Sequence, residues 1–187
     1  MFLLEKLKEI FFIHIELSFL LILLFTVVSV VYWSYRNGIS PMPTSPKVRK
    51  ILFPSLPVGV VGKVYDLGSG LGTLVFPLAK HYPCSQVTGY ETSPLPYYLS
   101  KCRQLLNPLP NITLSRSNFY SIKLHDASLV ICYLYPGAMK QLKIKFEQEL
   151  KPGTWIISNT FTIPGWEPLE IIEVNDLYRT KIYIYRK

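Results

Sequence analysis

The chain has 187 residues, enough for one domain of ordinary size and an appendage. Hydrophobic residues make up 49% and charged residues only 17%, a balance that argues against a wholly soluble protein and predicts a membrane segment. The net charge of +8 suits RNA, anionic lipid or acidic protein surfaces equally and does not choose among them. Cys84, Cys102 and Cys132 lack the paired spacing of a zinc knuckle, so we expect no metal site and three buried, unreactive thiols in a reducing compartment.

The first predicted element is a membrane anchor helix over residues 1–35. Residues 17–33 carry no charge, and with residues 10–16 they are long enough to cross a hydrocarbon core about 30 Å thick. A cleavable signal peptide is the alternative, but no small-residue cleavage site follows the apolar run and the start of the chain lacks net positive charge. More lysine and arginine residues follow the span than precede it, which predicts a single-pass protein with its C-terminal part on the cytoplasmic or organellar matrix side.

Five prolines in residues 36–61 predict an extended connector with one short helical pattern at 47–53. From residue 62 to the end, strand and helix patterns alternate, as in βαβ units. The expected strands are 63–67, 86–91, 112–115, 128–134 and 154–161, and the expected helices are 72–81, 94–106 and 137–150. Strand patterns at 170–175 and 181–186 predict an antiparallel hairpin. Residues 62–187 are thus predicted to form an α/β domain, a Rossmann-like doubly wound sheet with a C-terminal antiparallel hairpin.

A glycine-rich turn is predicted within residues 64–74, VYDLGSGLGTL. Glycine costs roughly 0.5–1 kcal/mol relative to alanine inside a regular element, so three glycines this close indicate positive φ angles or a close approach of the main chain to a ligand. Ligands of doubly wound sheets bind at this first strand-to-helix turn. A dinucleotide is disfavoured, because the spacing is GxGxG, Thr73 stands where the GxGxxG pattern has its third glycine, and Asp66 would repel a pyrophosphate.

Asp66 suits a ligand with a cationic end instead. Glu91, at the end of the next predicted strand, can accept hydrogen bonds from both hydroxyls of a ribose. A ligand with an amino group, a ribose and a sulfonium but no phosphate matches this pair, and S-adenosylmethionine is such a ligand. The competing interpretations are a strand-ending aspartate in a turn for Asp66 and a cap of the following helix for Glu91.

These motifs resemble those of the class I, seven-strand S-adenosylmethionine-dependent methyltransferases, over about residues 43–187. VYDLGSGLG is similar to their motif I, GYE to their motif II, and LKPGTWIIS to the turn that enters their fifth strand. More narrowly, the N-terminal helix, PTSPKVRKIL, CYLYP and FTIPGWEP resemble the small membrane-anchored protein-lysine methyltransferases that act on the ATP synthase c subunit and the adenine nucleotide carrier, and their bacterial relatives. Leu71 and Thr73 depart from the sequence GSGDGR usual in that narrower family.

The resemblance implies roles for several residues. Asp66 would orient the amino group of the cofactor, Glu91 would accept from its ribose, and Thr44 and Pro46 would cover it. The remaining cofactor-binding residues implied are Gly68, Ser69, Gly70, Gly72, Asn118 and Phe119. The implied lining of the acceptor channel is Tyr133, Tyr135, Pro136 and Trp166. A plain loop residue remains the alternative for Asn118, core packing on one face of a strand for the two tyrosines, and packing under the connector for Trp166.

We therefore predict a membrane-anchored N-methyltransferase that transfers a methyl group in line to a lysine of a membrane-associated protein. An aromatic channel would favour the neutral amine by desolvation, with a tyrosine oxygen or bulk water taking the proton. RNA and lipid amines stay open as acceptors, although we expect a membrane protein rather than a nucleic acid. An NAD-dependent Rossmann oxidoreductase and a non-catalytic membrane adaptor are the alternative functions. The basic run at 140–151 is interpreted as the solvated face of an amphipathic helix, with membrane-surface contact as its alternative.

Overall fold

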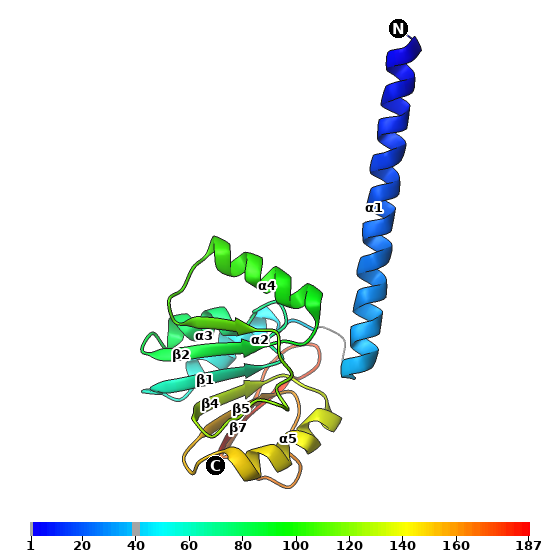
Figure 1. The fold of residues 1–187 in the computed structure, drawn as a ribbon. Coiled ribbons are helices and arrows are strands. Elements are labelled where there is room, and N and C mark those ends of the chain that lie inside the picture. The colour runs from blue at the N-terminus through cyan, green and yellow to red at the C-terminus, as the bar shows by residue number, and fades with distance from the viewer. Residues whose placement is uncertain (1, 39–41) are drawn as a thin grey trace. The chain divides into compact units, whose positions relative to one another are not determined.

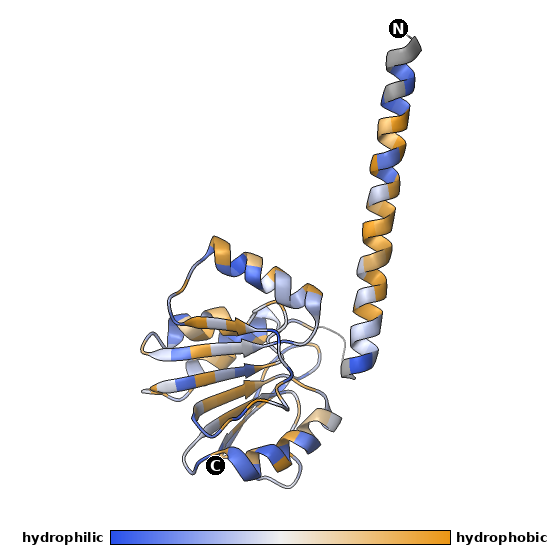
Figure 2. Ribbon diagram, in the orientation of Figure 1, coloured by the Kyte–Doolittle hydropathy of each residue, from blue (hydrophilic) through white to orange (hydrophobic). Residues whose placement is uncertain are grey.

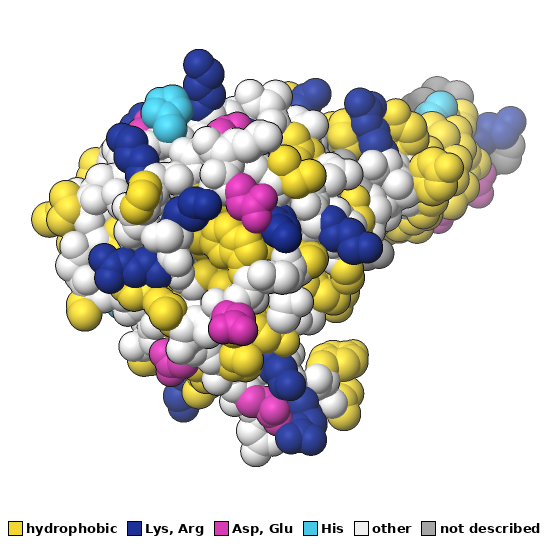
Figure 3. Space-filling model, turned by 90° about the horizontal axis from the view of Figure 1, so that it is seen from below, with side chains coloured by type: hydrophobic (Ala, Val, Ile, Leu, Met, Phe, Trp, Pro, Cys, Tyr) yellow, Lys and Arg dark blue, Asp and Glu magenta, His cyan; other side chains and the backbone are white. Residues whose placement is uncertain are grey.

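The computed structural model describes residues 2–38 and 42–187, and the chain divides into two compact units, residues 1–40 and 41–187. Residues 39–41 of the predicted connector lie outside the described part. The first unit contains the helix α1 (Phe2–Asn37), within which Lys8–Arg36 is long and apolar enough to cross a membrane, with a mean hydropathy of 2.5. Hydrophobic residues dominate the middle of this helix and much of its surface (Figures 2 and 3). A membrane span has these properties, and so does a signal sequence.

The segment expected to be a connector contains the predicted short helix, and from residue 41 on it belongs to the second unit. α2 (Pro46–Leu52) begins after Ser45, whose hydroxyl accepts a hydrogen bond from the Val48 amide at 3.2 Å, and the 3-10 turn η1 (Phe53–Ser55) follows. The buried side chains of this segment are Val48, Leu52, Leu56 and Val60. Proline is tolerated at the first position of a helix because its missing N–H would have no partner there, which is why Pro46 does not prevent α2.

A seven-stranded sheet forms the centre of the second unit (Figure 1). Its strands are β1 (Gly62–Leu67), β2 (Ser85–Tyr90), β3 (Ile112–Ser115), β4 (Ala127–Cys132), β5 (Trp155–Asn159), β6 (Glu170–Glu173) and β7 (Lys181–Arg186). Their order is β3-β2-β1-β4-β5-β7-β6, with β1 to β5 parallel and β7 antiparallel to both of its neighbours. This order confirms the predicted doubly wound sheet with its reversed C-terminal hairpin. The strand order reverses between β1 and β4, where ligands of such sheets bind.

Helices cover both faces of the sheet (Figure 1). α3 (Val75–His81) packs with α2 on one face and α5 (Pro136–Glu149) packs on the other, while α4 (Pro94–Leu106) lies on the α3 side. Residues of β1 alternate between the two sides, because Val64 belongs to the α3 core whereas Tyr65 and Leu67 belong to the α5 core. The first turn after β1 therefore opens between two packed layers.

Two predicted boundaries differ because of local backbone angles. The helix after the glycine turn begins at Val75 and not at Gly72, since Gly72 has a φ of 75°, which a right-handed helix does not contain. β5 ends at Asn159 and not at residue 161, since Thr160 has a φ of 75° and turns the chain.

One prediction about burial is wrong, and a second fails at a single residue. Cys84 and Cys102 are exposed, and Cys132 is the buried cysteine. Lys145, which belongs to the run interpreted as a solvated helix face, is only 8% exposed. A buried lysine needs partners for its ammonium group, and those partners are described with the site.

Candidate active site

The turn after β1 is built around three glycines in the left-handed region. The φ angles of Gly68, Gly70 and Gly72 are 82°, 52° and 75°, so the positive φ expected from the glycine spacing is present at each. A Cβ atom on Gly72 would lie 2.5 Å from the ring of Phe76, whereas one on Gly70 would meet nothing within 4 Å. Gly72 thus allows close packing against α3, and the main chain at Gly70 borders open space.

Ser69 shows a contact that the sequence reasoning missed. Its side chain is buried, and a Cβ atom on Gly89 of β2 would lie 2.8 Å from both Cβ and Oγ of Ser69. The amides of Gly68 and Ser69 both donate to the Tyr90 carbonyl at 2.9 Å. The glycine of the GYE segment was the available signal, because glycine inside a strand often marks a close backbone approach.

Asp66 lies at the carboxyl end of β1 and is 2% exposed. Its carboxylate accepts a hydrogen bond from the Val75 backbone at the start of α3. Its Oδ2 atom is buried and has no hydrogen-bond partner among the described residues. Burial, together with the nearby Glu91 carboxylate, raises the pKa of Asp66 to about 7. A buried acceptor of this kind fits a donor, and above all a cationic one, supplied from outside the chain.

Glu91 follows β2 and joins the glycine turn to α4. Its Oε2 accepts a hydrogen bond from the Gly70 amide at 2.9 Å and its Oε1 accepts one from the Ser93 amide at 2.7 Å. The second bond is the capping role foreseen as the alternative. Each carboxylate oxygen has a second lone pair, so these bonds leave acceptor capacity for a ribose. The structure therefore brings Asp66, the glycine turn and Glu91 together at the strand-order reversal.

The loop after β3 carries Asn118, Phe119 and Tyr120. Asn118 is exposed, and its side-chain oxygen accepts from the Tyr120 amide at 3.0 Å in a local turn. Phe119 is half-buried against the α5 core, and its ring centroid lies 4.5 Å from that of Tyr120. The expected contacts of Asn118 and Phe119 with adenine therefore stay predictions.

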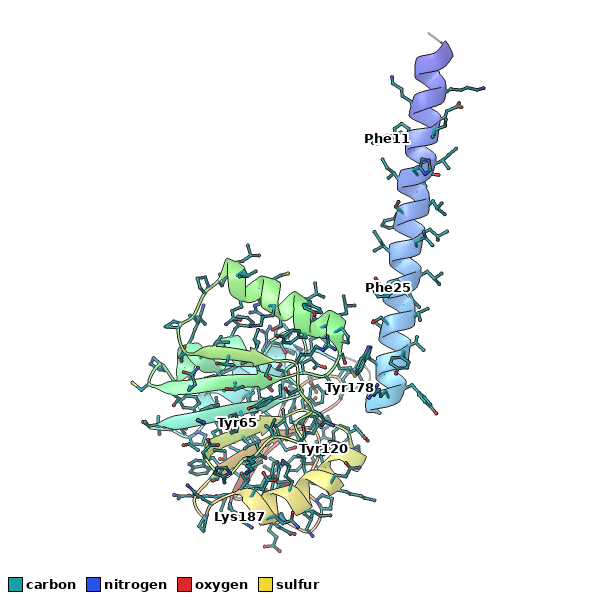
Figure 4. All side chains as sticks on the ribbon, in the orientation of Figure 1. Phe11, Phe25, Tyr65, Tyr120, Tyr178 and Lys187 are labelled. Atoms are coloured by element: carbon teal, nitrogen blue, oxygen red, sulfur yellow. The ribbon has the colours of Figure 1, made fainter. Side chains whose placement is uncertain are left out.

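Tyr120 was not singled out from the sequence. Its hydroxyl is buried and has no hydrogen-bond partner in the described part of the chain. Burial raises the pKa of Tyr120 to about 12, and nearby Tyr135 and Cys132 add to the effect. Figure 4 labels Tyr120 beside the sheet and α5. The hydroxyl of Tyr120 thus approaches the segment after β4 that carries the predicted acceptor residues.

Tyr133 and Tyr135 lie in the loop after β4, because that strand ends at Cys132. The alternative that both tyrosines lie on one face of a strand is therefore wrong. Tyr135 precedes α5 and packs against the α5 core, with its ring lying across Gly137. Pro136 is the exposed first residue of α5. The structure therefore places Tyr120, Tyr135 and Pro136 in one neighbourhood at the start of α5.

The structure does not bring Trp166 to this neighbourhood. Its indole nitrogen donates to Glu147 near the end of α5 at 3.2 Å, and its ring lies 5.2 Å from the ammonium group of Lys187, the last residue. Figure 4 shows Lys187 well away from Tyr120. Thr44 is buried directly before α2. The predicted roles of Trp166 and Thr44 remain predictions.

An ion pair on α5 holds the loop that carries Asn118 to Tyr120. The ammonium group of Lys145 donates to the Tyr120 carbonyl at 3.1 Å, to the Ile122 carbonyl, and to Glu149 at 2.6 Å. The other carboxylate oxygen of Glu149 accepts from the Leu124 amide at 2.8 Å. Lys145 and Glu149 thus fix this loop against α5 from a buried position.

Two further features of the described residues add no chemistry to this site. They contain no group of three or more His, Cys, Asp or Glu side chains placed to hold a metal ion. A hollow of about 410 Å³ is lined by Pro46, Arg49, Lys50, Phe53, Pro54 and Pro77. Pro46 is implied by the resemblance to cover the cofactor, but the lining contains neither of the carboxylates Asp66 and Glu91 and none of the turn glycines.

Comparisons with known proteins identify the family of the chain. The family model described as ANTKMT methyltransferase domain matches residues 66–170. A protein-lysine N-methyltransferase of Saccharolobus islandicus is 30% identical over 152 residues, which cover 76% of this chain and 89% of the relative. An adenine nucleotide translocase lysine N-methyltransferase of mouse is 31% identical over 121 residues, which cover 63% of this chain and about half (52%) of the mouse protein.

Solved structures show the same fold. An RNA methyltransferase of Salinibacter ruber, in complex with S-adenosyl-L-homocysteine, has a TM-score of 0.67 and 23% identity, covering 78% of this chain and 93% of its own. A putative methyltransferase of Escherichia coli has a TM-score of 0.64 and 17% identity, covering 78% and 87%. At these identities the similarity concerns the fold.

Proposed function

Because this chain belongs to the ANTKMT methyltransferase domain family and is therefore an S-adenosylmethionine-dependent methyltransferase, we propose that it methylates the side-chain nitrogen of a lysine in a membrane-associated protein. The lysine acceptor follows from the two curated relatives, one named as a protein-lysine methyltransferase and the other as acting on adenine nucleotide translocase. Membership of this family also excludes the NAD-dependent oxidoreductase considered from the sequence.

The observation that supports the cofactor site best is the unpartnered Oδ2 of Asp66 beside three left-handed glycines. We assign Asp66 to the amino group of the cofactor, the main chain around Gly70 to its amino-acid part, and Glu91 to its ribose. An ammonium group close to Asp66 would favour the ionised carboxylate and thereby offset the burial that raises its pKa. When bound, S-adenosylmethionine supplies an electrophilic methyl group that an amine displaces in line.

We assign the acceptor channel to the tyrosines at the start of α5. Aromatic rings favour a methylated cation by roughly 0.5–2 kcal/mol, which suits the product of this reaction. A lysine must first lose its proton, which costs about 4.6 kcal/mol at pH 7 from a pKa of about 10.4. A partly apolar channel reduces this cost because burial disfavours the ammonium form.

Tyr120 does not act as the general base in this proposal. A tyrosine accepts a proton at neutral pH only as tyrosinate, and the pKa of Tyr120 is raised to about 12, so its hydroxyl stays protonated. Its role is to position the acceptor nitrogen through a hydrogen bond. The lysine proton then leaves to water or to another tyrosine oxygen of the channel.

The membrane part of the proposal comes from α1. Its apolar stretch would hold the enzyme at the bilayer and raise the effective concentration of lysines on membrane proteins. We propose a single-pass anchor with the catalytic domain on the cytoplasmic or organellar matrix side, from the excess of basic residues after the span. A non-catalytic adaptor would keep the same anchor and fold but transfer no methyl group.

The test is methyl transfer from radiolabelled S-adenosylmethionine to isolated membranes by the full chain. We expect label in a protein band and methyllysine in its hydrolysate. Glu91→Ala should abolish the label, while Glu167→Ala, which removes an exposed loop carboxylate, should leave it unchanged. Label in RNA or lipid would refute the lysine assignment, and cofactor binding without transfer to any fraction would support the adaptor.

A further inference from the structure

α4 turns an apolar side away from its own domain. At 100° per residue, one arc of about 120° contains only apolar or weakly polar side chains. These are Leu95, Tyr98, Leu99, Cys102, Leu105 and Leu106, here named the α4 stripe. Leu105 and Leu106 are 82% and 81% exposed, and Tyr98, Leu99 and Cys102 are exposed as well. The apolar end of this helix is visible in Figure 2.

The side of α4 that faces the domain carries polar side chains beside the buried Pro96 and the half-buried Tyr97. Arg103 donates to the Gly72 carbonyl at 3.3 Å, and its guanidinium lies 4.5 Å from the centre of the Phe76 ring. Gln104 donates to the Ile112 carbonyl at 3.1 Å, and Ser100 is buried. A helix on a soluble protein has the reverse arrangement, with its apolar side on the core. The α4 stripe is therefore not needed for packing and is available to something outside the domain.

We propose that the α4 stripe lies in the headgroup region of the bilayer in which α1 is anchored. This inference rests on the membrane anchor of the proposed function. It would place the cofactor site at the membrane surface, because α4 starts three residues after Glu91 and is bonded to the glycine turn through Arg103.

Charge favours lipid as the occupant. Residues 94–110 contain no aspartate or glutamate, and Lys101 borders the stripe. An apolar helix face with leucines, a tyrosine and a basic residue at its border is typical of helices that lie in an anionic membrane interface. A protein partner is the other possible occupant, and the test below separates the two.

The length of the tether adds a second argument. Eight residues separate the end of α1 at Asn37 from the start of α2 at Pro46. Fully extended, they span at most about 28 Å. With α1 in a bilayer, the domain can never leave the lipid surface by more than this reach, so lipid is present at high effective concentration whatever the arrangement of the two units.

Two natural cysteines allow a direct test on the full chain. Cys102 lies in the stripe, Cys84 is exposed in the turn before β2, and Cys132 is buried. The chain is reconstituted into phosphatidylcholine liposomes containing phosphatidylglycerol. A fluorophore is attached to Cys102 in the Cys84→Ser variant, or to Cys84 in the matched Cys102→Ser variant. Nitroxide-labelled lipids then quench a fluorophore that lies in the headgroup region.

We expect the lipids to quench at least half of the fluorescence at Cys102 and little at Cys84. Replacing Leu105 and Leu106 with glutamate in the Cys84→Ser chain should lower quenching at Cys102 to the level at Cys84. Equal quenching at the two cysteines in an inserted chain would overturn the lipid-facing assignment and leave a protein partner for the stripe. A chain that alkaline carbonate extracts from the liposomes would overturn the anchor, and with it this inference.

Discussion

Replacing Asp66 with asparagine is expected to stabilise the ligand-free protein above neutral pH while removing cofactor binding. The pKa of Asp66 is raised from 3.8 to about 7, chiefly by burial. In the unfolded chain this carboxyl group ionises at its ordinary pKa. Between about pH 4 and pH 7 the folded state therefore holds a proton that the unfolded state has lost, and the free energy of unfolding falls as the pH rises.

The size of this effect follows from the pKa difference. About three pKa units at 1.36 kcal/mol each correspond to on the order of 4 kcal/mol of stability lost between pH 4 and pH 8. Asparagine keeps an oxygen that can accept from Val75 but adds a buried amide nitrogen without a partner, at a cost of about 1–3 kcal/mol at every pH. We therefore expect the Asp66→Asn variant to be more stable than the wild type by about 1–3 kcal/mol at pH 8 and less stable near pH 4.

The assay is urea unfolding of the full chain in mild detergent between pH 4 and pH 8, followed by tryptophan fluorescence. Asp126→Asn is the matched control, because the pKa of Asp126 is shifted in the opposite direction to that of Asp66. Burial acts to raise the pKa of Asp126, but hydrogen bonds from Lys63 and Tyr65 outweigh it and leave the pKa lowered. Asp126 therefore stabilises the fold above its unfolded pKa and loses this effect in acid, so Asp126→Asn should cost most at neutral pH.

A constant stability difference between wild type and Asp66→Asn across this pH range would refute the reasoning. So would undiminished binding of S-adenosylhomocysteine by the variant, because Asp66 would then not hold the amino group.

Three further substitutions test the glycine turn and the α5 ion pair. Gly72→Ala should lower the free energy of unfolding by about 2–4 kcal/mol, from positive φ and overlap with Phe76. Gly70→Ala should cost only about 1–2 kcal/mol but weaken S-adenosylhomocysteine binding at least tenfold, and unchanged binding in calorimetry would contradict a ligand at that main chain. Lys145→Met should cost about 2–4 kcal/mol in urea unfolding, because its buried acceptors lose their donor. The control Lys143→Met breaks a surface pair at 3.8 Å and should change stability by less than about 0.5 kcal/mol, so equal losses for the two lysines would contradict a buried clamp.

Local signals made the sheet and the glycine turn predictable. Strand and helix periodicity gave the order of elements, and the bounds of α4 and β7 agree with the expected ranges. The positive φ angles of the three glycines were predictable, because glycine adopts left-handed φ without a steric penalty and the sequence alone shows where the glycines lie. Asp66 lies at the carboxyl end of β1 and Glu91 directly follows the neighbouring parallel strand β2, so both carboxylates lie at one edge of the sheet.

Features set by tertiary contacts were not predictable in this way. Lys145 looks like its solvated neighbours in the sequence, and only the loop from Tyr120 to Leu124 buries it. Tyr120 depends on the same packing, since its hydroxyl is buried and its pKa is affected by Tyr135 and Cys132, which are distant in the sequence. The helical periodicity of α4 separates an apolar from a polar side, but it does not indicate which of the two sides faces the domain.

The most direct test of the account is calorimetric titration of the full chain, in detergent, with S-adenosylhomocysteine and separately with NADH. We expect S-adenosylhomocysteine to bind one-to-one and Glu91→Ala to weaken this binding at least tenfold. We expect NADH not to bind. Binding of NADH, or no heat with S-adenosylhomocysteine from the folded wild-type chain, would contradict the assignment of the two carboxylates and the glycine turn to a sulfonium nucleoside.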